Sequence, residues 1–168
     1  MNAKLERYIA DGFMTEAQAE YIEAAIKNGE TLIASGHRSA GVKNLMAACM
    51  AMVMESHAVV KMKTAADASA DAKYILIPAL PEETYNEMLQ ASFNEKGKSI
   101  VTMKAPEYPY SVIKLMTVAY KTNPDPDKVV NLMECNKIDG EPKLMKFSRM
   151  TYNENGKVSR EDKEVLAV

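Results

Sequence analysis

The fold is decided by the stretch Thr31-Leu-Ile-Ala-Ser35, which is followed by the loop Gly36-His-Arg-Ser-Ala-Gly41 and a helical pattern from about Lys43 to Glu55. A short apolar run bounded by glycine is typical of a buried strand. Three more such runs follow, separated largely by helical patterns: Ala58–Lys63, Lys73–Ile77 and Lys98–Met103. Strands that alternate with helices indicate βαβ units. The sequence therefore predicts an α/β fold with a mostly parallel sheet that is covered by helices on both faces.

The first thirty residues carry helix signals. Residues 1–13 predict a short N-terminal helix that stops at Asp11-Gly12. Thr15 and Gln18 have the spacing of a capping box, in which each side chain bonds the other residue's backbone. The helix that they open is predicted to end at Asn28-Gly29, because glycine suits the left-handed position after a helix.

The second half predicts two more helices and an edge hairpin. The helices are expected over residues 81–89 and 110–120. Val129–Cys135 and Leu144–Tyr152 form an expected antiparallel pair around Asp139-Gly140, a strong turn signal. Residues 153–168 are a polar tail that we expect to be partly loose. Because no linker or repeat interrupts the chain, all 168 residues are predicted to form a single domain.

The composition excludes several classes of protein. Lys and Arg number 21 and Asp and Glu 23, so no basic field favours nucleic acid as a partner. The longest uncharged apolar stretch, Leu45 to Met54, has ten residues, whereas a membrane span needs about 17. The N-terminus lacks the apolar segment of a signal peptide, and Cys49 and Cys135 have no metal-ligand spacing. We therefore expect a cytoplasmic domain that does not span a membrane.

Methionine is unusually frequent, with 13 residues. Met46, Met50 and Met54 stand on one face of the predicted helix, and Met52 lies off that stripe. Flexible thioethers can fill a helix–sheet core, or they can line a groove that binds a partner. Both interpretations stay open at this point.

The loop after the first strand is where α/β folds place ligands. A phosphate-binding P-loop has the pattern G-x-x-x-x-G-K-[ST], in which the lysine reaches the phosphates and the hydroxyl holds magnesium. Gly36 and Gly41 have the required spacing, but Val42 takes the lysine position and Lys43 the hydroxyl position. The candidate nucleotide- or anion-binding site is this degenerate loop, which consists of Gly36, His37, Arg38, Ser39, Ala40, Gly41, Val42, Lys43 and Asn44.

The order of segments from Met14 to Met150 resembles the RecA-like ATPase domain of the traffic ATPases, the hexameric motors of type II and type IV secretion and of pilus assembly. The segments that carry the resemblance are Lys27-Asn-Gly-Glu-Thr-Leu-Ile-Ala-Ser-Gly36, Tyr74-Ile-Leu-Ile-Pro-Ala-Leu-Pro81, Glu87-Met-Leu-Gln-Ala91, Lys98-Ser-Ile-Val-Thr-Met-Lys-Ala105 and the hairpin Val129–Met150. The resemblance implies a three-layer RecA-like domain, with a mostly parallel sheet and an antiparallel edge hairpin.

The resemblance also implies a loss of catalysis. The family's P-loop lysine corresponds to Val42, its magnesium-side hydroxyl to Lys43, its glutamate to Ala79, its arginine to Pro81 and its histidine to Lys104. Phosphoryl transfer depends on electrostatic stabilisation by such groups. We therefore expect a catalytically inactive homologue without a cofactor. It would act as a binding or regulatory module of a secretion, conjugation or pilus apparatus, through self-association or through a protein of that apparatus.

Two alternative functions stay open. A one-residue bulge between Gly41 and Lys43 would make Lys43 the phosphate lysine and Asn44 a weak metal ligand, giving a weak ATPase that binds ATP or ADP with magnesium. The chain could instead be a small α/β interaction protein without a secretion role. Arg38 is either a solvated loop residue or an anion ligand at the start of the helix. His37 and His57 lack a second ligand at metal spacing, so no metal site is expected.

Overall fold

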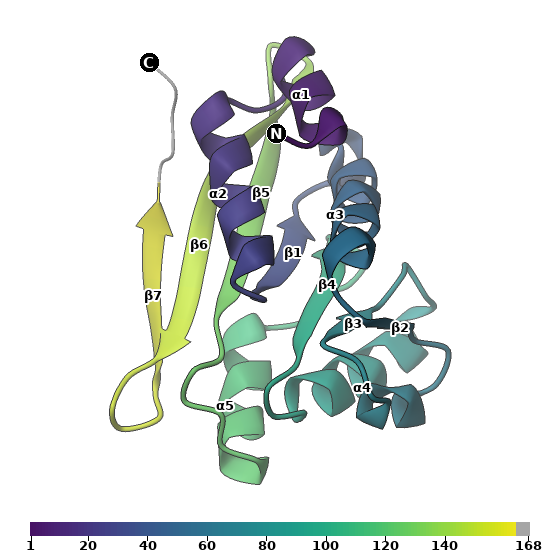
Figure 1. Ribbon diagram of the computed structural model, residues 1–168, viewed down its shortest axis with the longest axis vertical. Coiled ribbons are helices and arrows are strands. Elements are labelled where there is room, and N and C mark those ends of the chain that lie inside the picture. Colours follow the sequence, from purple (N-terminus) through teal and green to yellow (C-terminus); the bar gives the residue numbers. More distant parts are fainter. Residues whose placement is uncertain (164–168) are drawn as a thin grey trace.

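The computed structural model describes residues 1–163, apart from the side chain of Glu82, and its middle layer is a seven-stranded sheet (Figure 1). The strand order is β2-β3-β4-β1-β5-β6-β7. The bounds are β1 (Thr31–Ser35), β2 (Val59–Lys61), β3 (Tyr74–Leu76), β4 (Ser99–Lys104), β5 (Val130–Ile138), β6 (Glu141–Tyr152) and β7 (Val158–Lys163).

The parallel part of the sheet matches the sequence prediction. β1 pairs in parallel with β4 and β5, β3 pairs in parallel with β2 and β4, and β3 is an interior strand. Only the strand ends differ from the prediction, by one to three residues. The predicted hairpin is also present, because β5 and β6 are antiparallel on either side of Asp139-Gly140.

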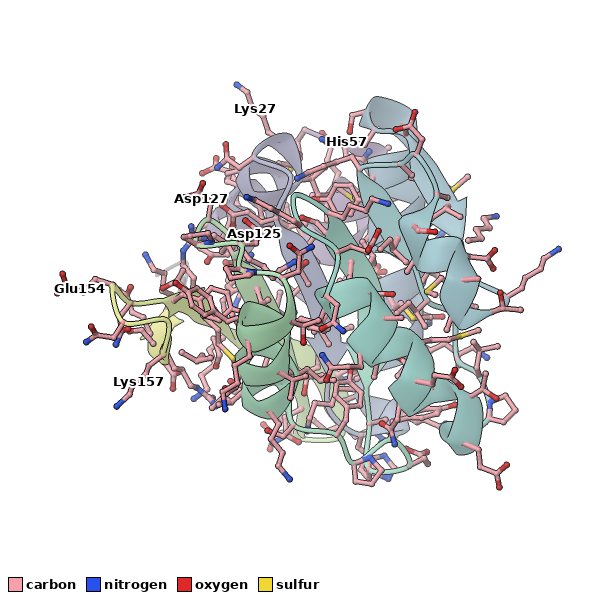
Figure 2. The ribbon with its side chains drawn as sticks, turned by 90° about the horizontal axis from the view of Figure 1, so that it is seen from below. Lys27, His57, Asp125, Asp127, Glu154 and Lys157 are labelled. Atoms are coloured by element: carbon pink, nitrogen blue, oxygen red, sulfur yellow. The ribbon has the colours of Figure 1, made fainter. Side chains whose placement is uncertain are left out.

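Helices cover both faces of the sheet, and Figure 2 shows the layers from below. α2 and α3 lie on one face, and α4 and α5 on the other. The helix bounds are α1 (Ala3–Ala10), α2 (Glu16–Lys27), α3 (Val42–Ser56), α4 (Glu82–Phe93) and α5 (Val112–Thr122), with short 3₁₀ turns η1 (Arg38–Ala40) and η2 (Ala65–Ser69). The predicted capping box of Thr15 and Gln18 opens α2. The three-layer α/β fold is thus confirmed.

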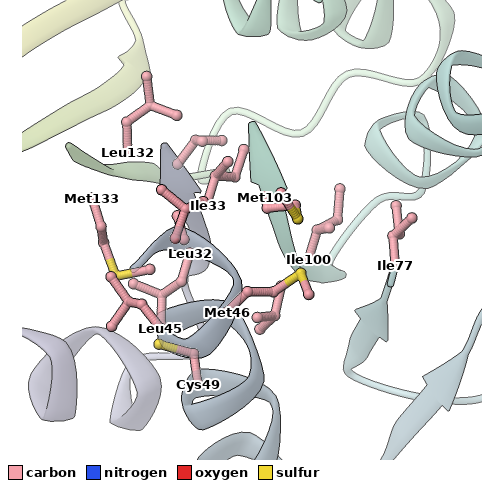
Figure 3. Close-up of a cluster of buried hydrophobic side chains, with 14 of the residues drawn as sticks. Leu32, Ile33, Leu45, Met46, Cys49, Ile77, Ile100, Met103, Leu132 and Met133 are labelled. Atoms are coloured by element: carbon pink, nitrogen blue, oxygen red, sulfur yellow. The ribbon is translucent and has the colours of Figure 1, made fainter. Parts of the chain in front are cut away.

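Part of the core lies between α3 and the sheet (Figure 3). Leu32 of β1 points toward Leu45 of α3, whereas Ile33 points to the opposite face of the sheet. Both strand residues are fully buried. Cys49 is also fully buried in this layer, and burial raises the pKa of its thiol to about 12. Such a thiol behaves as a small apolar side chain and not as a nucleophile.

The methionine stripe of α3 is only partly a core feature. Met46 and Met52 are buried and Met50 is half-buried, but Met54 is 47% exposed. The core interpretation is confirmed for Met46 and wrong for Met54. Met52 and Val53, in the same last turn, are buried, so the helix stays packed to its end. Residues four apart advance by about 40° around a helix, and the second such step turns Met54 away from the sheet.

Part of the polar tail is ordered, because residues 158–163 form β7, a strand that was not predicted, and pair with β6. Asp162 of β7 accepts hydrogen bonds from Lys146 (2.9 Å), Ser148 (2.9 Å) and Arg160 (3.1 Å). The Lys146 ammonium, followed by Arg160 and Ser148, holds the pKa of the Asp162 carboxyl well below its usual value. An edge strand pairs along one side only. Here the ion pair between Asp162 of β7 and Lys146 of β6 adds to the backbone pairing of the two strands. Residues 164–168 of the predicted tail lie outside the described residues.

A buried polar network joins α2, β1 and the edge hairpin at the amino end of β1. Glu30 accepts hydrogen bonds from Arg149 Nη1 and Nη2, at 2.7 and 3.2 Å, and from Asn131 Nδ2 at 3.0 Å. Tyr21 donates to Asn131 Oδ1 at 2.7 Å. Because Glu30 and Asn131 are buried, a lost partner here would leave a charge or an amide unsatisfied.

We expect Arg149→Met to lower the free energy of unfolding by about 2 kcal/mol, because the buried Glu30 carboxylate loses its only counter-ion in the network. Arg7→Met is the matched control, because Arg7 is exposed and its ion pair with Asp11 is long, at 4.0 Å, and therefore weak. Urea denaturation of the two variants measures the difference. Equal stability of the two variants would show that the network does not hold the hairpin to β1.

Candidate functional site

The degenerate loop lies at the carboxyl edge of the parallel strands. β1 continues into residues 36–41 and α3, while the adjacent β4 continues into residues 105–111 and α5. α3 and α5 cover opposite faces of the sheet (Figure 2), so the two loops leave the sheet in opposite directions. Open α/β sheets bind ligands at such a point. Lys104 lies here too, because Ser35, Gly36, His37 and Lys104 line one shallow cleft of about 280 Å³.

The loop is closed by hydrogen bonds within itself. His37 Nδ1 accepts from the Ser39 amide at 3.2 Å and lies 2.9 Å from the Ser39 hydroxyl. The Ala40 amide donates to the His37 carbonyl at 2.9 Å, and the Gly41 amide donates to the Arg38 carbonyl at 3.3 Å. A P-loop directs these amides at phosphate oxygens. Here three successive amides are already bound inside the turn.

The two glycines of the motif have structural reasons to be glycine. Gly36 has a φ of +138°, and a Cβ at this position would lie 2.5 Å from the Cys135 carbonyl oxygen. Gly41 has a φ of +83° and precedes α3, where a Cβ would lie 3.2 Å from the Phe13 ring. The spacing that matches a P-loop therefore serves the turn from β1 over β5 and into α3.

The residues after Gly41 do not form a phosphate cradle. α3 begins directly at Val42, whose side chain is fully buried in the core. Lys43 and Asn44 are exposed in the first turn, and Asn44 faces a cleft beside α1. No extra residue separates Gly41 from the helix, so the loop lacks the bulge that the weak-ATPase alternative requires.

Arg38 is a largely solvated loop residue that also makes one ion pair. Its Nε lies 3.0 Å from Glu107 Oε1, in the loop that follows β4. Both side chains are largely exposed, so this ion pair contributes little to stability. The anion-binding interpretation of Arg38 stays a prediction.

The other positions to which the resemblance assigned functional residues are spread over the same edge of the sheet. Ala79 is half-buried after β3, and Pro81 is the N-cap of α4. Sequence reasoning missed the surroundings of Lys104, whose Nζ lies 5.8 Å above the ring of Tyr110. Tyr110 precedes α5, although it was predicted within that helix, and its hydroxyl donates to the Met103 carbonyl at 2.6 Å. Only the turn before α5 brings this ring to Lys104.

The remaining titratable candidates have local roles. His37 and His57 lie at opposite ends of α3, and Figure 2 shows His57 at the end remote from the loop. Asp125, at that remote end, accepts from the Gly97 amide at 2.8 Å and pairs with Lys128 at 3.7 Å. Within residues 1–163, no three His, Cys, Asp or Glu side chains gather as a metal site would require.

Comparison with known proteins leaves the resemblance as a prediction. No model of a known protein family matches the chain, and no curated protein matches it significantly. Among the described residues, no helix is both long enough and apolar enough to cross a membrane.

We expect Gly36→Ala to destabilise the protein by about 3 kcal/mol, because the added Cβ meets the Cys135 carbonyl and the backbone is strained. Gly140→Ala is the control: its φ is +79°, but no atom lies within 4 Å of the added Cβ. There we expect a loss of about 1 kcal/mol from backbone strain alone. Chemical denaturation compares the two, and equal losses would contradict the close approach of the loop to β5.

Proposed function

We propose that the protein is a catalytically inactive relative of the traffic-ATPase RecA-like domain, and that it acts in the cytoplasm as a binding or regulatory module of a secretion, conjugation or pilus apparatus. The family assignment is supported by the ordered series of segments that resemble that domain. The loss of catalysis is supported by one observation, the closed loop at the nucleotide position.

Catalysis of phosphoryl transfer needs a cation and a metal ion positioned at the phosphates. The side chain at the lysine position, Val42, is apolar and points into the core. Lys43 is exposed on α3, and Arg38 is paired with Glu107. The loop amides that would bind phosphate oxygens are bonded within η1. Each of these features leaves one stabilising group out of the site. Such a group typically supplies several kcal/mol of transition-state stabilisation, and about 1.4 kcal/mol corresponds to a tenfold change in rate.

We expect no binding of ADP or ATP with magnesium at roughly 1 mM nucleotide, which is the upper end of common KM values. We also expect no hydrolysis above that of a boiled control. Isothermal calorimetry and a phosphate-release assay measure the two. Lys43→Ala is the diagnostic variant, and Lys114→Ala, an exposed lysine of α5, is its control. Turnover that Lys43→Ala abolishes and Lys114→Ala preserves would overturn the proposal in favour of the weak ATPase.

A binding module also needs a free surface. Ile113 and Val118 of α5 are 45% and 44% exposed, and Met54 at the end of α3 is exposed to a similar degree. Isolated exposed apolar residues are common, so only an experiment assigns either helix to a partner. A specific and stable interface would bury at least about 1,000 Å² in total.

We expect the protein to self-associate or to retain an active ATPase of a secretion apparatus from its native host. Val118→Glu should abolish the contact if α5 forms it, and Met54→Glu should abolish it if α3 does, because a charge buried in an apolar interface is costly. Sedimentation and a pull-down with mass spectrometry provide the readouts. A monomer at high concentration that retains no apparatus protein would leave the interaction protein without a secretion role as the better description.

A further inference from the structure

An apolar cleft of about 330 Å³ opens where the β5–β6 hairpin meets the loop between α1 and α2. Most of the surface that it exposes is apolar. We name it the hairpin cleft and define it by its five large apolar lining residues, Phe13, Met14, Ile138, Leu144 and Met145. The first two and Leu144 form a buried base, whereas Met145 is half-buried and Ile138 is 44% exposed. The last two side chains therefore offer apolar surface to an occupant.

The long polar side chains in the lining of the cleft are already bound to the protein. Lys143 Nζ donates to the Gly12 carbonyl at 2.6 Å. Gln18 Nε2 donates to the Leu144 carbonyl at 2.9 Å, and Gln18 Oε1 accepts from the Thr15 amide at 2.9 Å. An occupant would therefore be held mainly by apolar contacts, which favours apolar side chains over an ion or a polar molecule.

β7 leads toward this cleft. It runs alongside β6 toward the end of the molecule at which α1 and the β5–β6 hairpin lie (Figure 1). Lys163, the last residue of β7, is paired with Phe147. Antiparallel partners count in opposite directions, so Val165 falls opposite Met145 in the same register. Two residues beyond β7, the register thus reaches a lining residue of the hairpin cleft.

The sequence after β7 changes from charged to apolar. Arg160–Lys163 are four charged residues, whereas Val165–Val168 are four apolar residues. Four consecutive apolar side chains are unfavourable in water unless another surface covers them. Glu164 stands between the two runs, and the register of β7 places it opposite Lys146, a residue of the opposite charge. The charge and the apolar run both fit this register.

Backbone pairing along the outer edge of β6 ends at Leu144. The Leu144 amide donates to the Phe13 carbonyl at 2.8 Å, and Gln18 already binds the Leu144 carbonyl. The loop between α1 and α2 thus takes the place that a further strand residue would occupy. A segment that continues β7 can pair only before this point, and beyond it side-chain contacts with the hairpin cleft must hold the segment.

We propose that the hairpin cleft is the docking site of residues 165–168 of the same chain, with Val165 beside Met145 and the next apolar residues against Ile138. A segment of the same chain is favoured over a second copy, because only Glu164 separates it from β7. Such a short connection gives an effective concentration of about 1 mM or more. The inference does not depend on the proposed function.

Disulfide cross-linking in the full chain tests the register. Met145→Cys combined with Val165→Cys should form an intramolecular disulfide under mild oxidation, because opposite residues of an antiparallel pair have Cβ atoms about 4.5–5.5 Å apart. Met145→Cys combined with Ser159→Cys is the matched control. Ser159 pairs with Thr151, six residues from Met145 along β6 and hence about 20 Å away, so we expect no cross-link. The two cysteines of the natural chain are buried and should not interfere.

Labelling of Met145→Cys alone with iodoacetamide measures how well the cleft is covered. Adding Val165→Asp should raise the labelling rate at least about tenfold, because a carboxylate does not stay on an apolar surface and the cleft opens more often. Adding Ser159→Asp places the same charge at an exposed position of β7 and should leave the rate within about threefold. Circular dichroism shows that each variant is folded.

Three outcomes would overturn the proposal. The first is a disulfide that joins two chains, which would assign the cleft to a second copy. The second is folded Met145→Cys with Val165→Cys that cross-links no faster than the control pair. The third is a labelling rate that Val165→Asp leaves unchanged. None of these outcomes bears on nucleotide binding or on the capture of an apparatus protein, so the proposed function stands or falls separately.

Discussion

β1 is buried on both faces and paired along both edges, and the rest of the fold follows from this constraint. Its backbone groups find partners only when β4 and β5 both lie alongside it. Its side chains leave water only when α3 covers one face and α5 the other. The candidate site lies where it does for the same reason, because the chain must leave the carboxyl end of this strand and turn at once into α3.

That turn explains why two glycines with the spacing of a P-loop occur here without the lysine of a P-loop. The first glycine allows the loop to pass over the Cys135 carbonyl, and the second allows α3 to begin against Phe13. Both requirements are steric and need no ligand. Val42 then closes the turn from inside, where a lysine would bring an unpaired charge into the core. With valine at this position, the loop serves as a packing element between β1 and α3.

The apolar periodicity predicted the parallel strands, because strands buried on both faces are continuous apolar runs. β7 escaped prediction because Val158–Lys163 is charged at four successive positions and has no buried face of its own. The loop closure by His37 was equally hidden, since a histidine cap has no distinctive spacing. The contact of Lys104 with Tyr110 also lay beyond any local pattern, because it depends on the turn that precedes α5.

The strand order also determines when the protein can fold. β1 is complete at residue 35, but its neighbours begin only at residues 99 and 130. Closing such long loops costs entropy before the contacts compensate for it, so a sheet of this kind forms slowly. During synthesis the apolar strand Thr31–Ser35 must wait for its first partner until residue 104 has left the ribosome, and for its second partner until residue 134 has done so. Over that interval the amphipathic α2 and α3, which flank the strand in sequence, are the segments closest at hand to shield it from aggregation.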